Sequence, residues 1–576
     1  MAVAFMASLE KSPETYDEAF DAVLEGRSSR IRERILKLVK LGMTVLDLGC
    51  GPGQFAIEAS EKGATVVGVD SSESMIALAK RRAATLEKPP VFVHTDVLAI
   101  GEETHNENAK TSSSNIIEQK FDLVVSTFLL SELKPIQRDL FIRIAREKLT
   151  DDGTLVIAAE TLPESGSDLN VFWSNRKSAE KNARRRLPQP IVSLDKVVQK
   201  AGIVIEDCEK YGPEITYLVG KKDLSEPLNE YQSRSKLFFG TRTRARIWYN
   251  HITGGWRGIP IEPGLYRAGN PSPESPVLVT ANYELTYYTV MRALAKDGVD
   301  AWVLVCDTAG INVWCAARGI HFNSDDVIQM IRLTGLAELV SHSELILPQL
   351  AAAGMNPTDI RRRTGFRVQY GPVRIQDLSK WLELGKPKPK PREMATVTFN
   401  LRERMEQTVA HVPFLFAVLL GKPIAAVLGV LALVNAIALA SPTAFAAIYP
   451  ITFQVLLFLG EFVFALAANA LVLGLLFPVL PSKGNSFWRR GLGLAAITLP
   501  FAVLVMVLIG VHWTVLVIWV VLQFILAVSL TMDWSGMTSV SDPKVIRREY
   551  PYLILTLKVG AGFLITFNLL VLFMGW

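Results

Sequence analysis

The loss of charge in the last third of the chain constrains its fold most strongly. From Pro413 to Trp576 charged residues become rare, and apolar runs reach the length of about 20 residues that crosses the hydrocarbon core of a bilayer. Length and charge together predict five membrane spans. These spans cover residues 423–440, 451–478, 491–511, 513–532 and 552–575.

Basic residues in the loops orient the predicted spans. The loops that follow the second and fourth spans are basic, and the other loops lack lysine and arginine; the basic residues are Lys483, Arg489, Arg490, Lys544, Arg547 and Arg548. Positive loops stay on the cytoplasmic side. We therefore expect residues 413–576 to be an all-α transmembrane domain of about five helices. It would lie in the lipid of the cell membrane as a multi-pass anchor, with the soluble domains in the cytoplasm.

The residues before Pro413 have the mixed composition of soluble domains, and a chain of 576 residues is too long for one hydrophobic core. Strand and helix patterns alternate over 1–222 and again over 260–384, which predicts an α/β head of two Rossmann-like domains. A basic linker, 223–259, joins them, and a Pro/Lys-rich extended spacer, 385–412, leads to the membrane.

Charge and cysteine content exclude several classes of function. The net charge of +5 is small for this length and its basic clusters are scattered, so we expect no nucleic-acid partner. Four dispersed cysteines without a C-x-x-C pair form neither a disulfide framework nor a zinc or iron-sulfur motif. The first residues lack the basic and apolar regions of a signal peptide, which also fits a cytoplasmic head.

The first domain contains a glycine turn between a buried strand and a helix. In "VLDLGCGPG" the residues Gly49, Gly51 and Gly53 lack side chains, so backbone N–H groups could approach a ligand. Asp70 ends the next strand, "VVGVD", where a carboxylate can accept both ribose hydroxyls. Asp96 follows the third strand and adds a polar contact. Cys50 lies within the turn and is expected to pack rather than to react.

These residues resemble the S-adenosylmethionine-dependent methyltransferases with the seven-stranded Rossmann-like fold. The resemblance covers about residues 14–222 and implies S-adenosyl-L-methionine (SAM) as a cofactor. It implies that Asp47 and the three glycines surround the methionine moiety and the ribose, and that Asp70 binds the ribose. It also places Asp96 with Val97 near the adenine ring. Nothing in the sequence identifies the methyl acceptor of this domain.

The second domain contains a cysteine at an expected helix start, in "DTAGINVWCAARG". Asn312 is a good N-cap residue, so Val313, Trp314 and Cys315 would form the first turn. A thiol there lies near unpaired N–H groups and the positive end of the helix dipole, which favours its thiolate. A soft thiolate suits a soft metal or an electrophile. The alternative is that Cys315, like Cys306, is a small buried apolar residue.

The stretches "SPVLVTANYEL", "DTAGINVWCAARG", "LVSHSELILPQLAAAG" and "RRRTGFRVQYGPVRIQDL" resemble the corrinoid-binding domain of the mercury-methylating HgcA family. That family is itself similar to the corrinoid iron-sulfur protein of acetyl-CoA synthesis. The resemblance covers about residues 260–384 and implies a cobamide cofactor, with Cys315 as the lower axial ligand of cobalt and the catalytic residue. Asn312 and Val313 belong to the same motif. Trp314, Ala316 and Ala317 would pack the cap helix against the corrin ring.

Four further residues fall in segments that resemble the pocket loops of that family: Thr280, Ser341, His342 and Gly371. Each could equally be a residue of the fold, and His342 could be a surface histidine. The chain also departs from the family motif, because Arg318 and Gly319 stand where the family has Gly-Lys. The basic side chain thus moves by about 100° around the helix. This change bears on the methyl acceptor more than on corrinoid binding.

Together these features predict a membrane-anchored, corrinoid-dependent methyltransferase that passes a cobalt-bound methyl group to a soft acceptor, with Hg(II) giving methylmercury as the first candidate. The alternatives are a corrinoid methyl carrier of one-carbon metabolism without a mercury substrate, and a non-catalytic membrane sensor or transporter. Because no iron-sulfur motif is present, cobalt reduction implies a ferredoxin-like partner on a separate chain. A methyl-tetrahydrofolate methyltransferase is a further possible partner.

Overall fold

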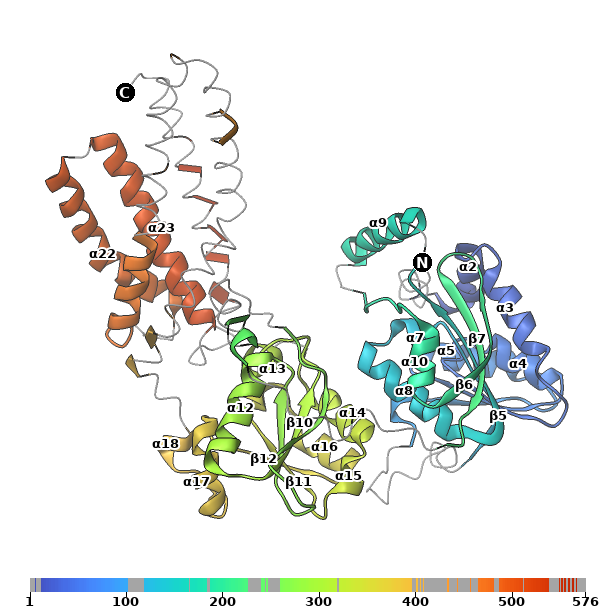
Figure 1. The fold of residues 1–576 in the computed structure, drawn as a ribbon. Coiled ribbons are helices and arrows are strands. Elements are labelled where there is room, and N and C mark those ends of the chain that lie inside the picture. The colour runs from blue at the N-terminus through green and yellow to red at the C-terminus, as the bar shows by residue number, and fades with distance from the viewer. Residues whose placement is uncertain are drawn as a thin grey trace.

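The computed structural model describes residues 12–101, 119–164, 166–183, 187–225, 259–318, 321–395, 465–480, 486–510 and 512–537, with short pieces between and beyond these ranges. These residues form two α/β domains and a group of apolar helices near the C-terminus (Figure 1). The predicted α/β head of two domains is therefore confirmed.

The first domain is built on a seven-stranded sheet with the order β3-β2-β1-β4-β5-β7-β6. Six of the strands run parallel and β7 runs antiparallel to both of its neighbours, as expected for the seven-stranded fold. The strands are β1 Thr44–Leu48, β2 Thr65–Asp70, β3 Val91–His94, β4 Phe121–Thr127, β5 Leu149–Glu160, β6 Ile203–Lys210 and β7 Ile215–Lys222. Each of these strands contains an apolar run from which the sequence predicts a strand.

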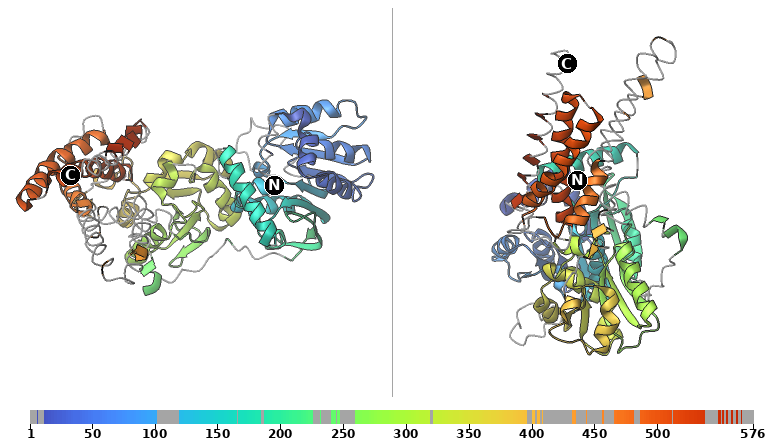
Figure 2. Two further views of the ribbon diagram at one scale, coloured as in Figure 1. Left: turned by 90° about the horizontal axis from the view of Figure 1, so that it is seen from above. Right: turned by 90° about the vertical axis from the view of Figure 1, so that its left-hand side faces the viewer.

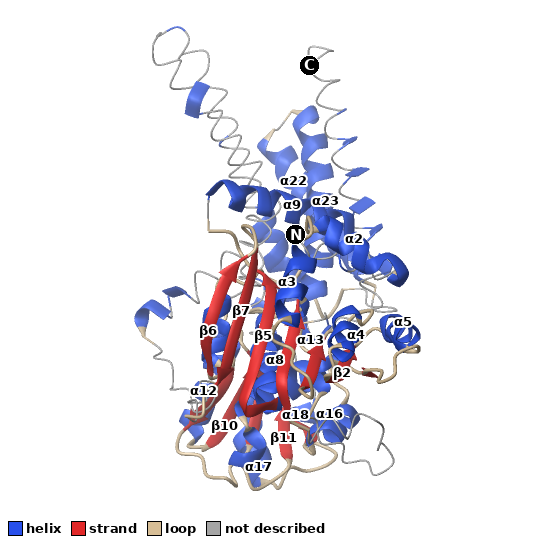
Figure 3. Ribbon diagram, turned by 90° about the vertical axis from the view of Figure 1, so that its right-hand side faces the viewer, coloured by secondary structure: helices blue, strands red, loops and turns tan. Residues whose placement is uncertain are grey.

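Helices cover both faces of this sheet (Figure 3). They are α2 Tyr16–Val23, α3 Arg27–Leu36, α4 Gln54–Glu61, α5 Glu73–Ala83, α7 Leu129–Glu132, α8 Pro135–Lys148, α9 Gly166–Ala183 and α10 Leu194–Lys200, with short 3-10 turns η1 Pro13–Thr15 and η2 Val97–Ala99. The chain before β1 forms two helices, α2 and α3, rather than one. Glu25 and Gly26 adopt φ values of 54° and 76°, a left-handed conformation that ends α2 and begins α3.

The second domain has a five-stranded sheet with the order β12-β11-β9-β10-β8. The strands are β8 Gly264–Ala268, β9 Val277–Ala281, β10 Ala301–Cys306, β11 Glu344–Leu347 and β12 Arg367–Tyr370. β8, which the sequence pattern did not predict, pairs antiparallel with β10, and the other pairs are parallel. The chain moves from β9 to β10 on one side and then crosses to β11 on the other, so the sheet has a topological switch point between β9 and β11.

The helices of the second domain are α12 Glu284–Asp297, α13 Val313–Arg318, α14 Ser324–Thr334, α15 Leu336–Leu339, α16 Pro357–Thr364, α17 Leu378–Glu383 and α18 Arg392–Ala395, with 3-10 turns η4 Gln349–Gly354 and η5 Ile375–Asp377. α18 lies in the segment predicted as an extended spacer. Residues 385–395 instead pack on the domain: Met394 is buried, its carbonyl accepts the N–H of Val373, and Lys390 donates to the carbonyls of Tyr370 and Gly371.

One hydrophobic core lies between the two sheets and is shared by both domains. It contains one face of β1, β2 and β5 with residues of α8, and one face of β9 and β10 with residues of α14. Separate cores cover the opposite face of each sheet. The two domains lie side by side in space (Figure 2). A continuous core makes their arrangement a property of the fold rather than of a flexible tether.

Two helices near the C-terminus are long and apolar enough to cross a membrane: α22 Phe487–Ile509 and α23 Trp513–Met537. They correspond to the predicted spans 491–511 and 513–532. A shorter apolar helix, Ala465–Leu476, falls in the predicted span 451–478. The predicted spans 423–440 and 552–575 lie largely outside the described residues. The structure thus describes two such helices where five were predicted, and it does not support a multi-pass arrangement.

Candidate functional site

The first cavity, of about 400 Å³, opens at the carboxyl ends of β1, β2 and β4. Six of the predicted binding residues line it together: Asp47, Gly49, Gly51, Asp70, Asp96 and Val97. Gly53 does not line it. It precedes α4 with φ 80°, and a Cβ there would lie 2.7 Å from the ring of Phe92 and 2.8 Å from Ala79, so its role is close packing of the turn.

The N–H groups of the glycine turn are already hydrogen-bonded to other groups of the protein. The N–H groups of Gly49 and Cys50 donate to the carbonyl of Val69 at 2.8 and 3.0 Å, and the N–H of Gly51 donates to the Asp70 carboxylate at 2.9 Å. The expectation that these amides approach a ligand is therefore corrected. A turn whose amides are already bonded has little to offer a phosphate.

Two of the carboxyl groups that line the first cavity, those of Asp47 and Asp70, have raised pKa values. Asp47 is only 2 % exposed, and burial together with the nearby Asp70 carboxylate raises its pKa to about 8. Burial also raises the pKa of Asp70, against the hydrogen bonds from Ser72 and Gly51 that lower it. Two buried carboxyl groups close together resist ionisation, and a cation between them stabilises the ionised pair. The residues present therefore fit a positively charged ligand such as SAM, which carries a sulfonium and an ammonium group.

The first cavity also contains the predicted residues Asp96 and Val97, and an aromatic wall that the sequence did not predict. The Asp96 carboxylate accepts the N–H of Leu98 at 2.9 Å and so caps η2, beside Val97. Burial raises the pKa of the Cys50 thiol well above its usual value, which agrees with a packing role. An aromatic wall was missed: Phe20 stacks against Tyr16 and meets Phe128 edge-on, and all three line the cavity. The positive φ of Phe128, 65°, directly after β4, has no sequence signal.

The second cavity, of about 540 Å³, opens at the carboxyl ends of β9 and β11, which is the switch point of the second sheet. Four predicted residues line it together: Thr280, Asn312, Val313 and Gly371. Ligands of open α/β sheets bind at such switch points. Most of the lining is apolar. The Thr280 hydroxyl is buried and has no hydrogen-bond partner within the described part of the chain, so a ligand group could satisfy it.

The predicted cap helix begins at the second cavity. The carbonyl of Asn312 accepts the N–H of Ala316 at 2.9 Å, which is the first helical bond of α13. Cys315 and Trp314 therefore occupy the first turn, as predicted, although their side chains lie outside the described residues. Ala316 and Ala317 are buried and do not line the cavity. A Cβ on Gly354 would lie 2.8 Å from the Ala317 carbonyl, so α13 packs tightly against η4.

Asn282 positions the loop that leads into α13, and sequence reasoning missed it. It is buried directly after β9, and its Oδ1 accepts the N–H groups of Thr308 and Gly310 at 2.9 and 3.0 Å. Its Nδ2 donates to Asp307 at 3.1 Å. Ala309 and Gly310 have positive φ values of 56° and 70°. A buried amide that satisfies several loop groups at once fixes a conformation that the backbone would not otherwise favour.

Ser341 and His342 are not brought to the second cavity. They precede β11 and so lie at the amino edge of the sheet, opposite the cavity. The N–H of Ser341 donates to the Pro273 carbonyl at 3.0 Å, and His342 Nε2 lies 2.9 Å from the Ser275 carbonyl oxygen. His342 lines a different cavity there, beside Glu274 and Glu344. Both residues hold the loop before β11.

The two cavities lie in two Rossmann-like α/β domains of one chain, each at the carboxyl ends of parallel strands. Residues 23–205 match the family model of a methyltransferase domain, and residues 253–382 match that of the CO dehydrogenase/acetyl-CoA synthase delta subunit. The chain therefore has a region similar to a methyltransferase domain, followed by a region similar to the CO dehydrogenase/acetyl-CoA synthase delta subunit. The expected similarity to proteins of acetyl-CoA synthesis is confirmed. The likeness to mercury-methylating proteins stays a prediction.

Individual relatives match only parts of the chain. The gamma subunit of the acetyl-CoA decarbonylase/synthase complex of Methanocaldococcus jannaschii is 43% identical over 111 residues, 19% of this chain and 22% of that protein. Its counterpart from Archaeoglobus fulgidus is 35% identical over 139 residues, 24% of this chain and 29% of that protein. The chain thus spans less than a third of these relatives.

Solved methyltransferase structures are similar to part of the chain. Magnesium protoporphyrin IX methyltransferase from Synechocystis PCC 6803 with bound SAH has a TM-score of 0.27 at 16% identity, and covers 36% of this chain and 87% of its own. A TehB-like SAM-dependent methyltransferase from Corynebacterium glutamicum has a TM-score of 0.24 at 18% identity, and covers 37% of this chain and 98% of its own.

Proposed function

We propose that this protein is a membrane-anchored, corrinoid-dependent methyltransferase that transfers a methyl group to a soft acceptor, with Hg(II) as the first candidate, and that its first domain binds SAM. The observation that carries the proposal is the second cavity. It lies at the switch point of the sheet and has the first turn of α13, with Cys315, at its edge. It also holds the Thr280 hydroxyl, which has no hydrogen-bond partner among the residues that the structure describes.

The corrinoid would supply a cobalt centre that can carry a methyl group. The chain itself would supply three things. Cys315 would bind the cobalt through its thiolate, Thr280 would donate or accept a hydrogen bond at the cavity wall, and Asn282 would hold the loop that places α13. Thiolate is a soft donor, which suits transfer to a soft acceptor. α22 and α23 would anchor the protein in the membrane.

The first domain would hold SAM between Asp47 and Asp70, with Val97 beside the adenine. The acidic cavity supports this choice over a nucleotide phosphate, because the turn amides that would bind a phosphate are already bonded. The SAM sulfonium would supply the methyl group. A methyl-tetrahydrofolate methyltransferase is an alternative donor to the second domain, and a separate ferredoxin-like protein would return the corrinoid to its reduced state.

A visible spectrum tests the central assignment. The full-length protein, purified without oxygen in detergent and reconstituted with cobalamin, should show a thiolate-ligated corrinoid. Cys315→Ala should lose that spectrum and keep a bound corrinoid. Cys208→Ala is the matched control, since Cys208 is an exposed thiol on β6 of the first domain. A spectrum that is the same in the wild type and in Cys315→Ala would refute the ligand assignment.

A second candidate function is a corrinoid methyl carrier of one-carbon metabolism, which the similarity to subunits of the acetyl-CoA decarbonylase/synthase complex supports. Turnover separates the two functions. With methyl-labelled SAM or methyl-tetrahydrofolate, a reductant and then Hg(II), the leading proposal requires label in methylmercury. Label that reaches the corrinoid and is not transferred to Hg(II) favours the carrier. Absence of any bound corrinoid contradicts both functions and favours a sensor.

A further inference from the structure

The segment beside the predicted adenine site is held by the second domain. Asp96, Val97 and Leu98 line the first cavity. The guanidinium of Arg332, on α14 of the second domain, donates to the carbonyl oxygens of Leu98 and Ile100, the latter at 2.8 Å. A charged donor that bridges two carbonyls is a strong contact. Arg332 thus holds the middle residue of the turn η2 and the residue that follows the turn, and η2 itself directly follows Asp96.

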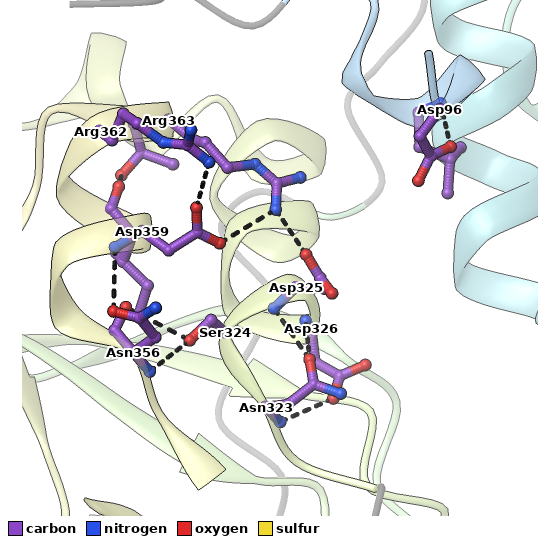
Figure 4. A network of polar contacts seen from close by, with 12 residues as sticks. Asp96, Asn323, Ser324, Asp325, Asp326, Asn356, Asp359, Arg362 and Arg363 are labelled. Atoms are coloured by element: carbon purple, nitrogen blue, oxygen red, sulfur yellow. Dashed lines mark hydrogen bonds and ion pairs between the residues drawn. The ribbon is translucent and has the colours of Figure 1, made fainter. Parts of the chain in front are cut away.

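Arg332 belongs to a helix that is firmly anchored in its own domain. The Asn323 side chain caps α14 by accepting the N–H groups of Asp325 and Asp326 at 2.8 and 3.2 Å. The Ser324 hydroxyl accepts the N–H of Asn356 at 2.7 Å, and Asp325 pairs with Arg363 of α16. Figure 4 shows this network, with Asp96 of the first domain beyond it. The donor is therefore placed by the second domain and not by the loop it holds.

The first domain holds α14 in return. The Arg143 guanidinium of α8 donates to the carbonyls of Arg332 and Leu333 at 3.3 and 2.6 Å, which satisfies acceptors in the last turn of α14. At the other end Lys134 lies 3.7 Å from Asp326. The two helices thus run side by side in the same direction, over the core that both domains share.

We infer that Arg332 is a positioning residue for SAM, so that the second domain completes the cofactor site of the first. The inference rests on the proposed function, because it takes SAM as the ligand of the first cavity. Without Arg332 the η2 turn would sample more conformations, and the ligand would have to select the competent one at a cost in affinity. The same contact links the occupancy of the first cavity to α14, and linkage between binding events is reciprocal.

Titration calorimetry with SAM on the full-length protein tests this role. Arg332→Met should raise the Kd for SAM about tenfold, since it removes two charge-assisted hydrogen bonds to the cofactor loop. Arg332→Lys keeps one donor and should restore part of the affinity. Arg143→Met is the matched control, because it removes the same kind of contact from the same interface without touching η2. Its Kd for SAM should stay within about twofold of the wild type.

Hydrogen exchange without ligand separates this inference from the proposed function. Amides 97–101 should exchange faster in Arg332→Met than in Arg143→Met, whether or not SAM is the ligand. An unchanged exchange rate and an unchanged Kd in Arg332→Met would overturn the inference. An equal loss of SAM affinity in both variants would also overturn it, since the interface as a whole would then be responsible. A wild-type protein that does not bind SAM would instead refute the proposed ligand of the first domain.

Discussion

Asp47 is the residue whose protonation most affects the first cavity. Its pKa of about 8 means that the carboxyl is largely protonated at neutral pH in the free protein. A cation binds its ionised form better, so the affinity for SAM should rise as the pH increases from 6 towards 8, by up to about tenfold per unit. Calorimetry across this range checks the slope.

Asp47→Asn should weaken SAM binding and flatten this dependence. The SAM amino group titrates in both measurements, so the difference between variant and wild type reports on Asp47 alone. Asp151→Asn, an exposed carboxylate outside the cavity, should keep the wild-type slope. The raised pKa also costs stability progressively as the pH rises from the unfolded value of about 3.9 to 8, and Asp47→Asn should remove that loss. If SAM affinity depended on pH equally in the wild type and in Asp47→Asn, the Asp47 carboxyl would not be the group responsible.

Asn282 carries the conformation of the loop before α13. Asn282→Ala leaves the buried N–H groups of Thr308 and Gly310 without their acceptor, which should lower the free energy of unfolding by about 2–3 kcal/mol. Denaturant unfolding measures this change, and the corrinoid spectrum should weaken with it. Asn270→Ala, at an exposed position, should change neither. A variant with unchanged stability and normal corrinoid binding would show that the loop keeps its conformation without the Asn282 side chain.

At the scale of elements, the contact between α13 and η4 is tight enough to test. A Cβ on Gly354 would lie 2.4 Å from the Phe322 carbonyl and 2.8 Å from that of Ala317. Gly354→Ala should therefore destabilise the protein by about 1–3 kcal/mol and displace α13, which weakens corrinoid binding. Thermal unfolding and the spectrum report the two effects. Gly166→Ala has open space around it and should be neutral.

The elements show how far sequence reasoning reaches. Strands such as β1, β4 and β10 are apolar runs that any buried parallel strand requires, and they were predictable. β8 is short and follows a turn-rich basic segment. It forms because its backbone pairs with the edge of β10, a contact that its own sequence does not indicate. Ser341 and His342 were misplaced although their position before β11 puts them at the amino edge. The break between α2 and α3 depends on the positive φ values of Glu25 and Gly26. The helical patterns on either side of these residues do not indicate that break.

The candidate sites divide in the same way. Asp47 and Asp70 lie at the ends of β1 and β2, and Asp96 follows β3, so their meeting at one edge follows from a parallel sheet. The hydrogen bonds of the turn amides and the aromatic wall of Phe20 and Phe128 follow from tertiary packing, which local patterns do not encode. The same holds for Arg332, whose acceptors lie more than 230 residues earlier in the chain. Contacts between domains carry no signal in a single sequence.

At the scale of the whole molecule, the shared core predicts that the two α/β domains unfold together. α8 and α14 pack against each other within that core, so separating the domains exposes apolar surface on both. Native-state hydrogen exchange should give the slowest amides of α8 and α14 the same free energy of opening. The double variant Arg143→Met/Arg332→Met loses both arginine contacts, and each loss should cost about 1.5–3 kcal/mol of stability. The opening free energies of α8 and α14 should then differ from each other. Arg362→Met, an exposed arginine whose ion pair lies within α16, should leave them equal. Different opening energies in the wild type would mean that each domain folds independently, and the coupling between the two cavities would then depend on the arginine contacts alone.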